Sequence, residues 1–361
     1  MTPVGAAVVE RALDALDRAP ALRVAVAGMA CLDQALIGKA RRRTRRGAPP
    51  WVDVVRREDG GGGAAAAATA LTDLGAAVRL VAPLGDDHEA ERLRRLLVAT
   101  GIDDRDLVSI AGTRTRASRR VVADDRVVAR FDEGGHGLLD RAVLDALAGQ
   151  ASYAAADCDA VLLVGDRRSG VVRGLVDRLV GDLAGHPCVV VVGSELEGLG
   201  RIAPRAVVTG TGAIARLALG PPTPTSLPVA SERARWLAAH EAEVRRRVGA
   251  GLVAVTLGPE GTVVATGGPA LYAPPGTPAA GPGDPMVEAW GPAFTVALAT
   301  GHDALAATHL ASVGAGLASW RSSPDDPTRR RLHELVRRRR PPLPLAPERP
   351  GDPARSPRPP T

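Results

Sequence analysis

The stretch Ala280–Gly301 combines residue types that suit phosphoryl chemistry. It reads AGPGDPMVEAWGPAFTVALATG, in which glycines, prolines and two acidic residues, Asp284 and Glu288, precede an apolar segment with helical character. A glycine-rich turn leading into a helix collects free backbone N–H groups at the positive end of the helix dipole, where a phosphate or a developing negative charge is stabilised. A carboxylate at such a turn can also act as a base. An ordinary helix N-cap uses the same residues, so the stretch by itself allows both interpretations.

Two earlier segments carry residues suited to binding a polar ligand. Leu22–Ala27 is a short apolar run typical of a buried parallel strand, and Asp33 follows it in a predicted loop. Ligands of open α/β sheets bind at the carboxyl ends of strands, so Asp33 could hydrogen-bond a polyol; a plain loop or capping aspartate is the alternative. Gly60–Gly75 begins with four glycines and continues as a strong helix former. Such a segment lets the backbone and a helix N-terminus approach a ligand closely.

The composition is that of a globular protein large enough to bury a full core. The chain has 361 residues, of which 45% are hydrophobic, and no apolar run approaches the roughly 20 residues that span a bilayer. Its N-terminus reads as an amphipathic helix with acidic residues and not as a secretion signal, so we expect a cytoplasmic protein. Cys31, Cys158 and Cys188 lack disulfide or metal-ligand spacing and are expected to be small buried hydrophobes.

The positive charge of the chain is concentrated at its end. Residues 321–361 contain eleven arginines and five acidic residues, an excess of six that equals the formal net charge of +6. Aromatic residues make up only 2% of the chain, which leaves few rings to stack on bases, so a folded nucleic-acid surface is not expected. The Arg- and Pro-rich tail is expected to be disordered. Its alternative role is an electrostatic contact with nucleic acid, anionic lipid or an acidic partner.

The order of the elements predicts a doubly wound α/β fold with a mostly parallel central sheet flanked by helices. Apolar strand-like runs alternate with helical segments along most of the chain. The runs typical of strands are Val78–Ala82, Ala160–Val164, Cys188–Val192, Ala206–Thr209 and Leu252–Thr256, with Thr262–Thr266 returning antiparallel. We expect an N-terminal helix in residues 1–20, one domain in residues 21–320 and the tail in residues 321–361.

One excursion interrupts this alternation. Arg119–Phe131 places two β-branched runs around an Asp-Asp pair, which predicts a β-hairpin, and Trp51–Arg57 could join it in a small lid. The lid strands are expected near residues 33–57 and 114–133. Arg119, Arg120 and Arg130 alternate with valines and are expected to form the solvent-facing side of the hairpin. Exposed edges of such a lid need covering, which makes a lid-mediated homodimer plausible.

The order of several motifs resembles one family. The runs GMACLDQALIG, GAPPWVDVVRRE, GGGGAAAAATALTDLGAAVRLVAPLGDD and ATGID resemble the N-terminal half of ribokinase-like (PfkB-type) carbohydrate kinases. TRASRRVVADDRVVARFDE is similar to the lid hairpin of the bacterial heptose-phosphate kinase branch, and DAVLLVGDRRSG to the strand and loop after it. VAVTLGPEGTVV resembles the TLGxxG nucleotide loop of the family. This collinear series, from about Arg23 to Trp320, is much more specific than any single motif.

The resemblance implies a β-lid over a sugar site and transfer of the γ-phosphoryl group of ATP to a hydroxyl of a sugar or sugar phosphate, with ATP and Mg²⁺ as cofactors. The residues that match sugar contacts are Asp33, Gly62 and Gly63, and those that match the nucleotide loop are Thr256, Gly258 and Gly261. The stretch Ala280–Gly301 falls where the family carries its GAGD anion hole and catalytic base. A base there would remove the hydroxyl proton while the helix N-terminus stabilises the transferring phosphoryl oxygens.

Three positions depart from the pattern of the family. Ala66 stands in place of a sugar-site asparagine, which removes a hydrogen-bond donor and an acceptor. Thr211 and Ile214 stand at the two ends of the metal-organising NxxE motif. An apolar isoleucine cannot replace a glutamate in a magnesium water network, so no protein metal ligand is predicted.

The GAGD motif can be placed in two ways. A match to residues 281–284 makes Asp284 the base and puts Gly281 and Gly283 in the anion hole, although Pro282 removes one of its N–H groups. A match without a gap puts Glu288 at the base position instead. Proline is tolerated only in the first helical turn, so Pro292 predicts a helix that starts between Glu288 and Pro292 and favours Asp284.

Two functional hypotheses follow. The retained Asp33, glycine pair and TLGxxG loop favour an active carbohydrate kinase with a modified site. The combined losses at Ala66, Thr211 and Ile214 favour a catalytically impaired relative that binds a nucleotide or sugar phosphate without efficient turnover. Loss of a single oxyanion donor can cost about 3 kcal/mol of barrier, so such losses matter.

Overall fold

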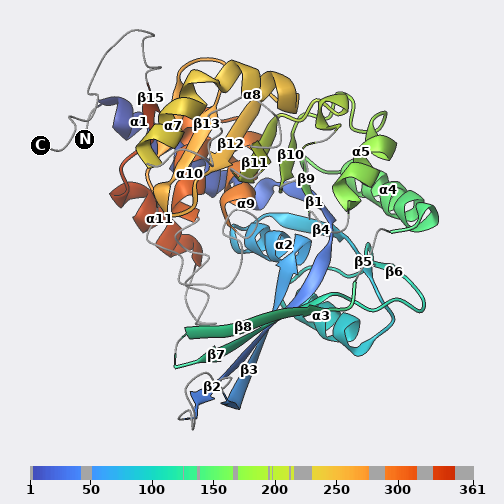
Figure 1. Cartoon of the computed structure of the whole chain (residues 1–361). Helices are drawn as coiled ribbons and strands as arrows, with labels where there is room; N and C mark the ends of the chain where they lie inside the picture. Colours follow the sequence, from blue (N-terminus) through green and yellow to red (C-terminus); the bar gives the residue numbers. More distant parts are fainter. Residues whose placement is uncertain are drawn as a thin grey trace, which may run out of the picture.

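The computed structural model describes the chain in segments that together cover the two sheets and the helices around them. The described residues are 3–41, 51–124, 126–135, 139–165, 170–193, 196, 198–210, 213–214, 230–275, 289–314 and 328–345. A central sheet carries helices on both faces, and a second sheet projects from one end of it (Figure 1). The elements expected from the alternation of strands and helices are thus present as a doubly wound α/β fold.

The central sheet has nine strands in the order β15-β14-β13-β12-β11-β10-β9-β1-β4. Its parallel part consists of β1 (Arg23–Gly28), β4 (Ala77–Val81), β9 (Ala160–Val164), β10 (Val189–Val192), β11 (Ala206–Gly210) and β12 (Leu252–Thr256). Its antiparallel part consists of β13 (Thr262–Ala265), β14 (Ala270–Ala273) and β15 (Leu343–Leu345). β9 and β10 are buried at every residue, as their continuous apolar runs require when helices cover both faces.

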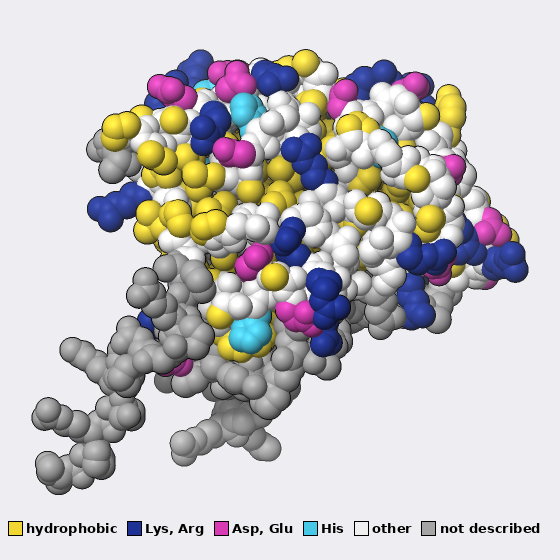
Figure 2. Space-filling model, turned by 90° about the horizontal axis from the view of Figure 1, so that it is seen from above, with side chains coloured by type: hydrophobic (Ala, Val, Ile, Leu, Met, Phe, Trp, Pro, Cys, Tyr) yellow, Lys and Arg dark blue, Asp and Glu magenta, His cyan; other side chains and the backbone are white. Residues whose placement is uncertain are grey.

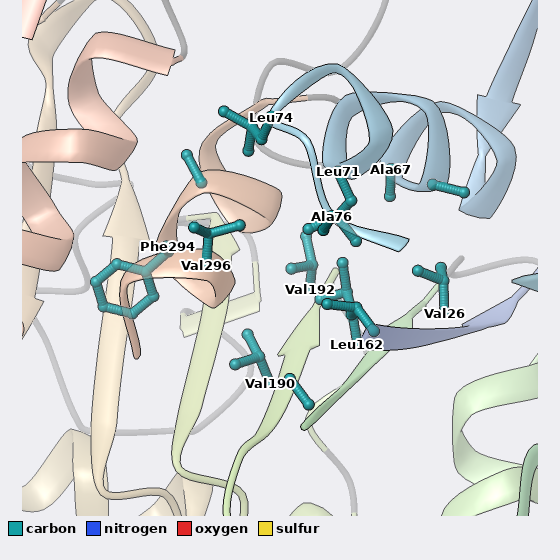
Figure 3. Packing of buried hydrophobic residues seen from close by; sticks show 14 of the residues in the cluster. Val26, Ala67, Leu71, Leu74, Ala76, Leu162, Val190, Val192, Phe294 and Val296 are labelled. Atoms are coloured by element: carbon teal, nitrogen blue, oxygen red, sulfur yellow. The ribbon is translucent and has the colours of Figure 1, made fainter. Parts of the chain in front are cut away.

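Helices cover the two faces of the sheet and form two apolar clusters. The first face carries α1 (Pro3–Arg18), α2 (Ala64–Asp73), α3 (His88–Ala99), α9 (Gly291–Ala299), α10 (Ala304–Gly314) and α11 (Thr328–Arg338). The second carries α4 (Arg141–Ala155), α5 (Val171–Leu179), α7 (Ala230–Ala239) and α8 (Glu241–Val248). Alternate strand residues point to opposite clusters. Leu162 and Val190 both belong to the first cluster, where they pack under α2 and α9 near Leu71 and Phe294, as Figure 3 shows.

The projecting sheet is the lid. It contains β2 (Ala30–Ala40), β3 (Val52–Gly63), β7 (Ala117–Ala123) and β8 (Arg126–Glu133), in the order β3-β2-β7-β8. β7 and β8 pair antiparallel, which confirms the predicted hairpin, and β2 pairs parallel with β7. β5 (Pro83–Leu84) and β6 (Val108–Ser109), which precede and follow α3 in the chain, pair parallel as a separate two-stranded ribbon.

Two predictions about local structure are wrong. Asp33 was expected in a loop but lies inside β2, because pairing with both β3 and β7 extends the strand through residue 40. The tail was expected to be disordered, but residues 328–345 form α11 and β15. α11 buries Leu332 and Val336 against the first cluster, and β15 completes the edge of β14, so this part of the tail has the apolar contacts that order requires.

The lengths of the helices and the charges on the surface bear on contacts with membranes and nucleic acids. None of the helices in the described segments is long and apolar enough to cross a membrane. On the face drawn in Figure 2, arginines and acidic side chains of the described residues are interspersed around apolar ones. The absence of a folded nucleic-acid surface stays a prediction.

Candidate active site

The carboxyl end of β1 meets the N-terminus of α2 through Gly63. The φ of Gly63 is 58°, and an added Cβ would lie 2.4 Å from the carbonyl oxygen of Met29. The N–H of Ala64 donates a hydrogen bond to that same oxygen at 2.8 Å. Only glycine combines this backbone conformation with this close approach, so the glycine run fixes the start of α2 beside the end of β1.

Asp33 and Gly62 lie on the same part of the lid, one strand apart. Gly62 pairs with Cys31 across β2 and β3, and a Cβ added at Gly62 would lie 2.5 Å from the Cys31 Sγ and 3.5 Å from the Asp33 Cβ. The structure therefore brings together Asp33, Gly62 and Gly63, the three residues assigned to sugar contact. Their role in binding stays a prediction.

Asp33 makes an ion pair with Arg120 of β7. The Arg120 Nη1 donates to the Asp33 Oδ2 at 3.0 Å, and the side chains are 16% and 21% exposed, respectively. The expectation that Arg120 faces solvent is therefore wrong. Sequence reasoning missed this pair because β2 and β7 are about 80 residues apart and pair in parallel, with Asp33 opposite Ser118, so that no local pattern connects them.

A turn after β12 contains the residues assigned to the nucleotide. Gly258 has φ 64° and open space where a Cβ would be, whereas a Cβ at Gly261 (φ 99°) would lie 2.3 Å from the carbonyl oxygen of Ala273. The N–H of Leu257 donates to the Gly261 oxygen at 2.8 Å, which closes the turn. Thr256 lies at the end of β12, and its hydroxyl donates to the Thr209 oxygen at 3.2 Å. The open face at Gly258 suits a phosphate or ribose approaching the backbone.

The segment proposed as anion hole and base lies outside the described residues, which resume at Ala289. This applies to Gly281, Gly283, Asp284 and Glu288. The helix after it, α9, begins at Gly291 with Pro292 in its first turn, so the predicted start between Glu288 and Pro292 is confirmed. Trp290 is 3% exposed, and its ring packs in a tilted arrangement against the ring of Phe294, with 4.7 Å between the ring centroids, which fixes this end of the helix in the core.

Two of the three departures from the family pattern are buried apolar positions. Ala66 is 2% exposed in the first turn of α2, and Ile214 is 1% exposed in the second apolar cluster. Thr211 lies outside the described residues. Within the described ranges, no group of three or more His, Cys, Asp or Glu is placed to hold a metal ion. The apolar side chain of Ile214 itself offers no oxygen ligand to a magnesium ion.

A pocket of about 210 Å³ lies at the base of the lid. Its walls include Met29, Gly85, Arg114, Arg116 and Asp140. Arg116 donates to Asp132 of β8 at 3.3 Å, and the Thr115 hydroxyl accepts from the Gly85 N–H at 2.9 Å. Met29 and Arg116 directly precede β2 and β7, the strands that carry Asp33 and Arg120, so the pocket lies at the start of these two strands.

Comparison with solved structures identifies the fold. Phosphofructokinase-2 from Escherichia coli in complex with fructose-6-phosphate superposes with a TM-score of 0.66 at 16% identity, covering 88% of this chain and 99% of that one. A ribokinase from Arabidopsis thaliana complexed with ribose and ATP gives 0.63 at 16% identity, covering 87% and 98%. The chain has the ribokinase-like fold.

Sequence comparison finds similarity to one family over part of the chain. Residues 29–158 match the model of the pfkB family carbohydrate kinase. The bifunctional protein HldE of Syntrophotalea carbinolica is 29% identical over 178 residues (48% of this chain and 36% of that protein). HldE of Halorhodospira halophila is 31% identical over 173 residues (47% and 35%). The match spans about a third of the length of these relatives. Residues 29–158 are therefore similar to the pfkB family of carbohydrate kinases.

Proposed function

We propose that the protein transfers the γ-phosphoryl group of ATP to a hydroxyl of a sugar or sugar phosphate held beneath the lid. The observation that carries the proposal is the position of Asp33, which Arg120 holds beside Gly62 and the N-terminus of α2. A carboxylate in this setting accepts hydrogen bonds from a polyol, and its Oδ1 is the acceptor that the Arg120 contact leaves for it.

The reaction needs three further contributions from the chain. Asp284, or alternatively Glu288, takes the proton of the attacking hydroxyl as that oxygen forms its bond to the γ-phosphorus. The bond from phosphorus to the bridging oxygen breaks, and ADP leaves. Backbone N–H groups of Gly281 and Gly283 stabilise the negative charge on the transferring group. Thr256, Gly258 and Gly261 bind the nucleotide.

Magnesium enters this proposal with ATP, whose phosphate charge it neutralises when bound. Since Ile214 is apolar and buried, the position where the family places its carboxylate provides no ligand. The residues of the chain therefore act by orienting the hydroxyl, excluding water and accepting its proton.

A sugar phosphate fits the pocket at the lid base better than a neutral sugar does. Arg114 and Arg116 both line it, and an arginine fork binds phosphate oxygens in pairs. Because the pocket lies at the start of β2, the strand that carries Asp33, one ligand would place its phosphate in the pocket and extend its hydroxyls toward the carboxylate.

A second candidate function is binding of nucleotide or sugar phosphate without efficient turnover. Ala66 and Ile214 favour it, because each is buried and apolar where the family uses a polar side chain. A lid-mediated homodimer remains a further proposal: the edge strands β3 and β8 expose Val55 and Phe131, and light scattering in solution would measure the oligomeric state.

The test measures phosphoryl transfer from magnesium ATP to a panel of sugars and sugar phosphates, alongside thermal-shift titrations with the same ligands. We expect turnover that Asp284→Asn lowers by about 10²–10⁴-fold and Glu288→Gln leaves nearly unchanged. The opposite pattern would make Glu288 the base. Ligand-induced thermal shifts in a folded protein that turns over no acceptor would establish the second function instead.

A further inference from the structure

The lid strands carry a second layer of polar side chains on the face opposite Asp33. Along β2 and β7, Asp33 and Arg120 alternate with Gln34 and Arg119, so the two pairs point to opposite faces. Gln34 is only 3% exposed. The Arg119 Nε donates to the Gln34 Oε1 at 3.1 Å, directly behind the Asp33–Arg120 ion pair.

This layer connects all four lid strands. The Gln34 Nε2 donates to the Asp59 Oδ1 of β3 at 2.8 Å. Arg119 of β7 also makes an ion pair with Glu133 of β8. One side chain from each strand thus belongs to a single network, and the expectation that Arg119 faces solvent is wrong: it is 14% exposed.

The same network attaches the lid to α3. The Arg119 Nη2 donates to Glu89 at 3.0 Å, and Arg92 makes an ion pair with Asp59. The side chains of Glu89, Asp59 and Arg92 are 16%, 19% and 24% exposed, so the charges are largely withdrawn from water. A guanidinium with several fixed donors can serve Gln34, Glu89 and Glu133 together, which a lysine ammonium does less well.

α3 in turn belongs to the main domain. Leu93 and Leu97 are fully buried in the first apolar cluster. Asp87 caps the helix by accepting from the Ala90 N–H at 3.0 Å, and its other oxygen accepts from the Thr115 N–H at 2.8 Å, just before β7. α3 is therefore a fixed support for the lid at both its N-terminus and its side.

We propose that this lid anchor (Gln34, Asp59, Glu89, Arg92, Arg119 and Glu133) sets the orientation of β2 and β7, and with it the geometry of Asp33 and Arg120. Arg119 and Gln34 are positioning residues: they act on the substrate through their neighbours and do not touch it. The kinetic part of this inference rests on the proposed function. A fully satisfied, partly buried network has one favoured arrangement, whereas an unpaired member is costly, so the lid is held in one register and tilt.

The test compares Arg119→Met and the milder Arg119→Lys and Gln34→Glu with Arg126→Met, an exposed arginine at the tip of the same hairpin. We expect KM for the sugar or sugar phosphate to rise about tenfold in the anchor variants with KM for ATP unchanged, and Arg126→Met to match the parent. Arg119→Lys should recover part of the loss because it keeps the charge. The two milder variants keep the test valid if Arg119→Met does not fold.

A second readout does not depend on turnover. Cys31 lies in β2 two residues before Asp33 and is half-buried, whereas burial raises the pKa of the Cys188 thiol to about 11 and keeps it unreactive. Thiol labelling, with the modified cysteine located by mass spectrometry, should be several-fold faster at Cys31 in the anchor variants. If the wild type shows no turnover, this change still supports the anchor. Lower melting temperatures with unchanged labelling of Cys31 and unchanged KM would reduce the network to a merely structural role and overturn the proposal.

Discussion

At the scale of single residues, the structure leaves no room for a side chain at Gly62 or Gly63. Gly62→Ala should raise KM for the acceptor and destabilise the fold by about 1–3 kcal/mol, because its Cβ would lie 2.5 Å from the Cys31 Sγ. Since that sulfur is a side-chain atom, Cys31→Ala in the same chain should recover most of both losses. Kinetics and chemical denaturation of the single and double variants measure this.

Gly63→Ala provides the contrast. Its Cβ would meet the backbone oxygen of Met29 at 2.4 Å, and its φ of 58° disfavours any side chain. Removal of the Cys31 sulfur cannot relieve either conflict, so Gly63→Ala should stay impaired in the Cys31→Ala background. Equal recovery at both positions would show that Cys31 does not limit the space beside Gly62.

The same residues show how far sequence reasoning reaches. Asp33, Gly62 and Gly63 were predicted as one group from the order of motifs, and the structure places them together. Arg119 and Arg120 were wrongly predicted to face solvent. The alternation of residues in a hairpin strand shows that the strand has two faces, but it does not show which other parts of the chain pack against each face. Their partners, Asp33, Gln34 and Glu89, come from distant parts of the chain.

At the scale of elements, an ion pair between Arg79 and the buried Asp106 links β4, at the edge of the central sheet, to the loop before β6 and to α4. Arg79 of β4 donates two hydrogen bonds of 2.8 Å to Asp106, whose side chain is 3% exposed, and Gln150 of α4 donates a third at 2.5 Å. Arg79→Met should therefore lower the free energy of unfolding by about 3 kcal/mol, because it leaves a buried carboxylate without its cation. Arg105→Met is the control, since the Arg105–Asp103 pair is exposed.

This pair also gives a pH dependence that thermal unfolding can measure. The hydrogen bonds from Arg79 lower the pKa of Asp106 in the folded state despite its burial. The unfolded chain then binds more protons in acid, so the contribution of this pair is complete above about pH 4 and is lost as the pH falls below it. Asp106→Asn should show a weaker loss of stability in that acid range than the parent. An unchanged acid slope would assign the loss to other carboxylates.

Elements with strong apolar periodicity were the ones that sequence predicted well. The buried runs of β9, β10 and β12 could be read directly, and their sheet order follows from the doubly wound pattern. α11 was missed because eight of its eleven residues, TRRRLHELVRR, are arginine, histidine, glutamate or threonine, and of the apolar remainder only Leu332 and Val336 are fully buried. The helix is stabilised by where it packs, which local composition does not reveal.

At the scale of the whole molecule, the helices near the two ends of the chain pack around α10. α1 contacts α10 and α11. Two polar contacts accompany this packing: the His302 Nε2 lies 3.0 Å from the Asp14 Oδ2, and the His333 Nε2 lies 2.8 Å from the Asp17 Oδ1. Between α10 and α11, the Nε2 of the fully buried His309 lies 3.0 Å from the Val336 oxygen. Because a carbonyl only accepts, Nε2 carries the proton and donates it.

Burial of His309 makes this junction sensitive to mild acid. Burial, assisted by the charge of Arg339, lowers the pKa of His309 below its usual value near 6.5. Below that pH the unfolded chain takes up a proton that the folded chain resists, so stability is complete above about pH 6.5 and falls as the pH drops further. His309→Gln keeps a donor for Val336 but cannot titrate, so its melting temperature should decline less than that of the parent between pH 7 and 5. His88→Gln, at an exposed position, should follow the parent throughout. If His309→Gln declined as steeply, protonation elsewhere would govern the acid response, and the α10–α11 junction would have to tolerate a buried imidazolium.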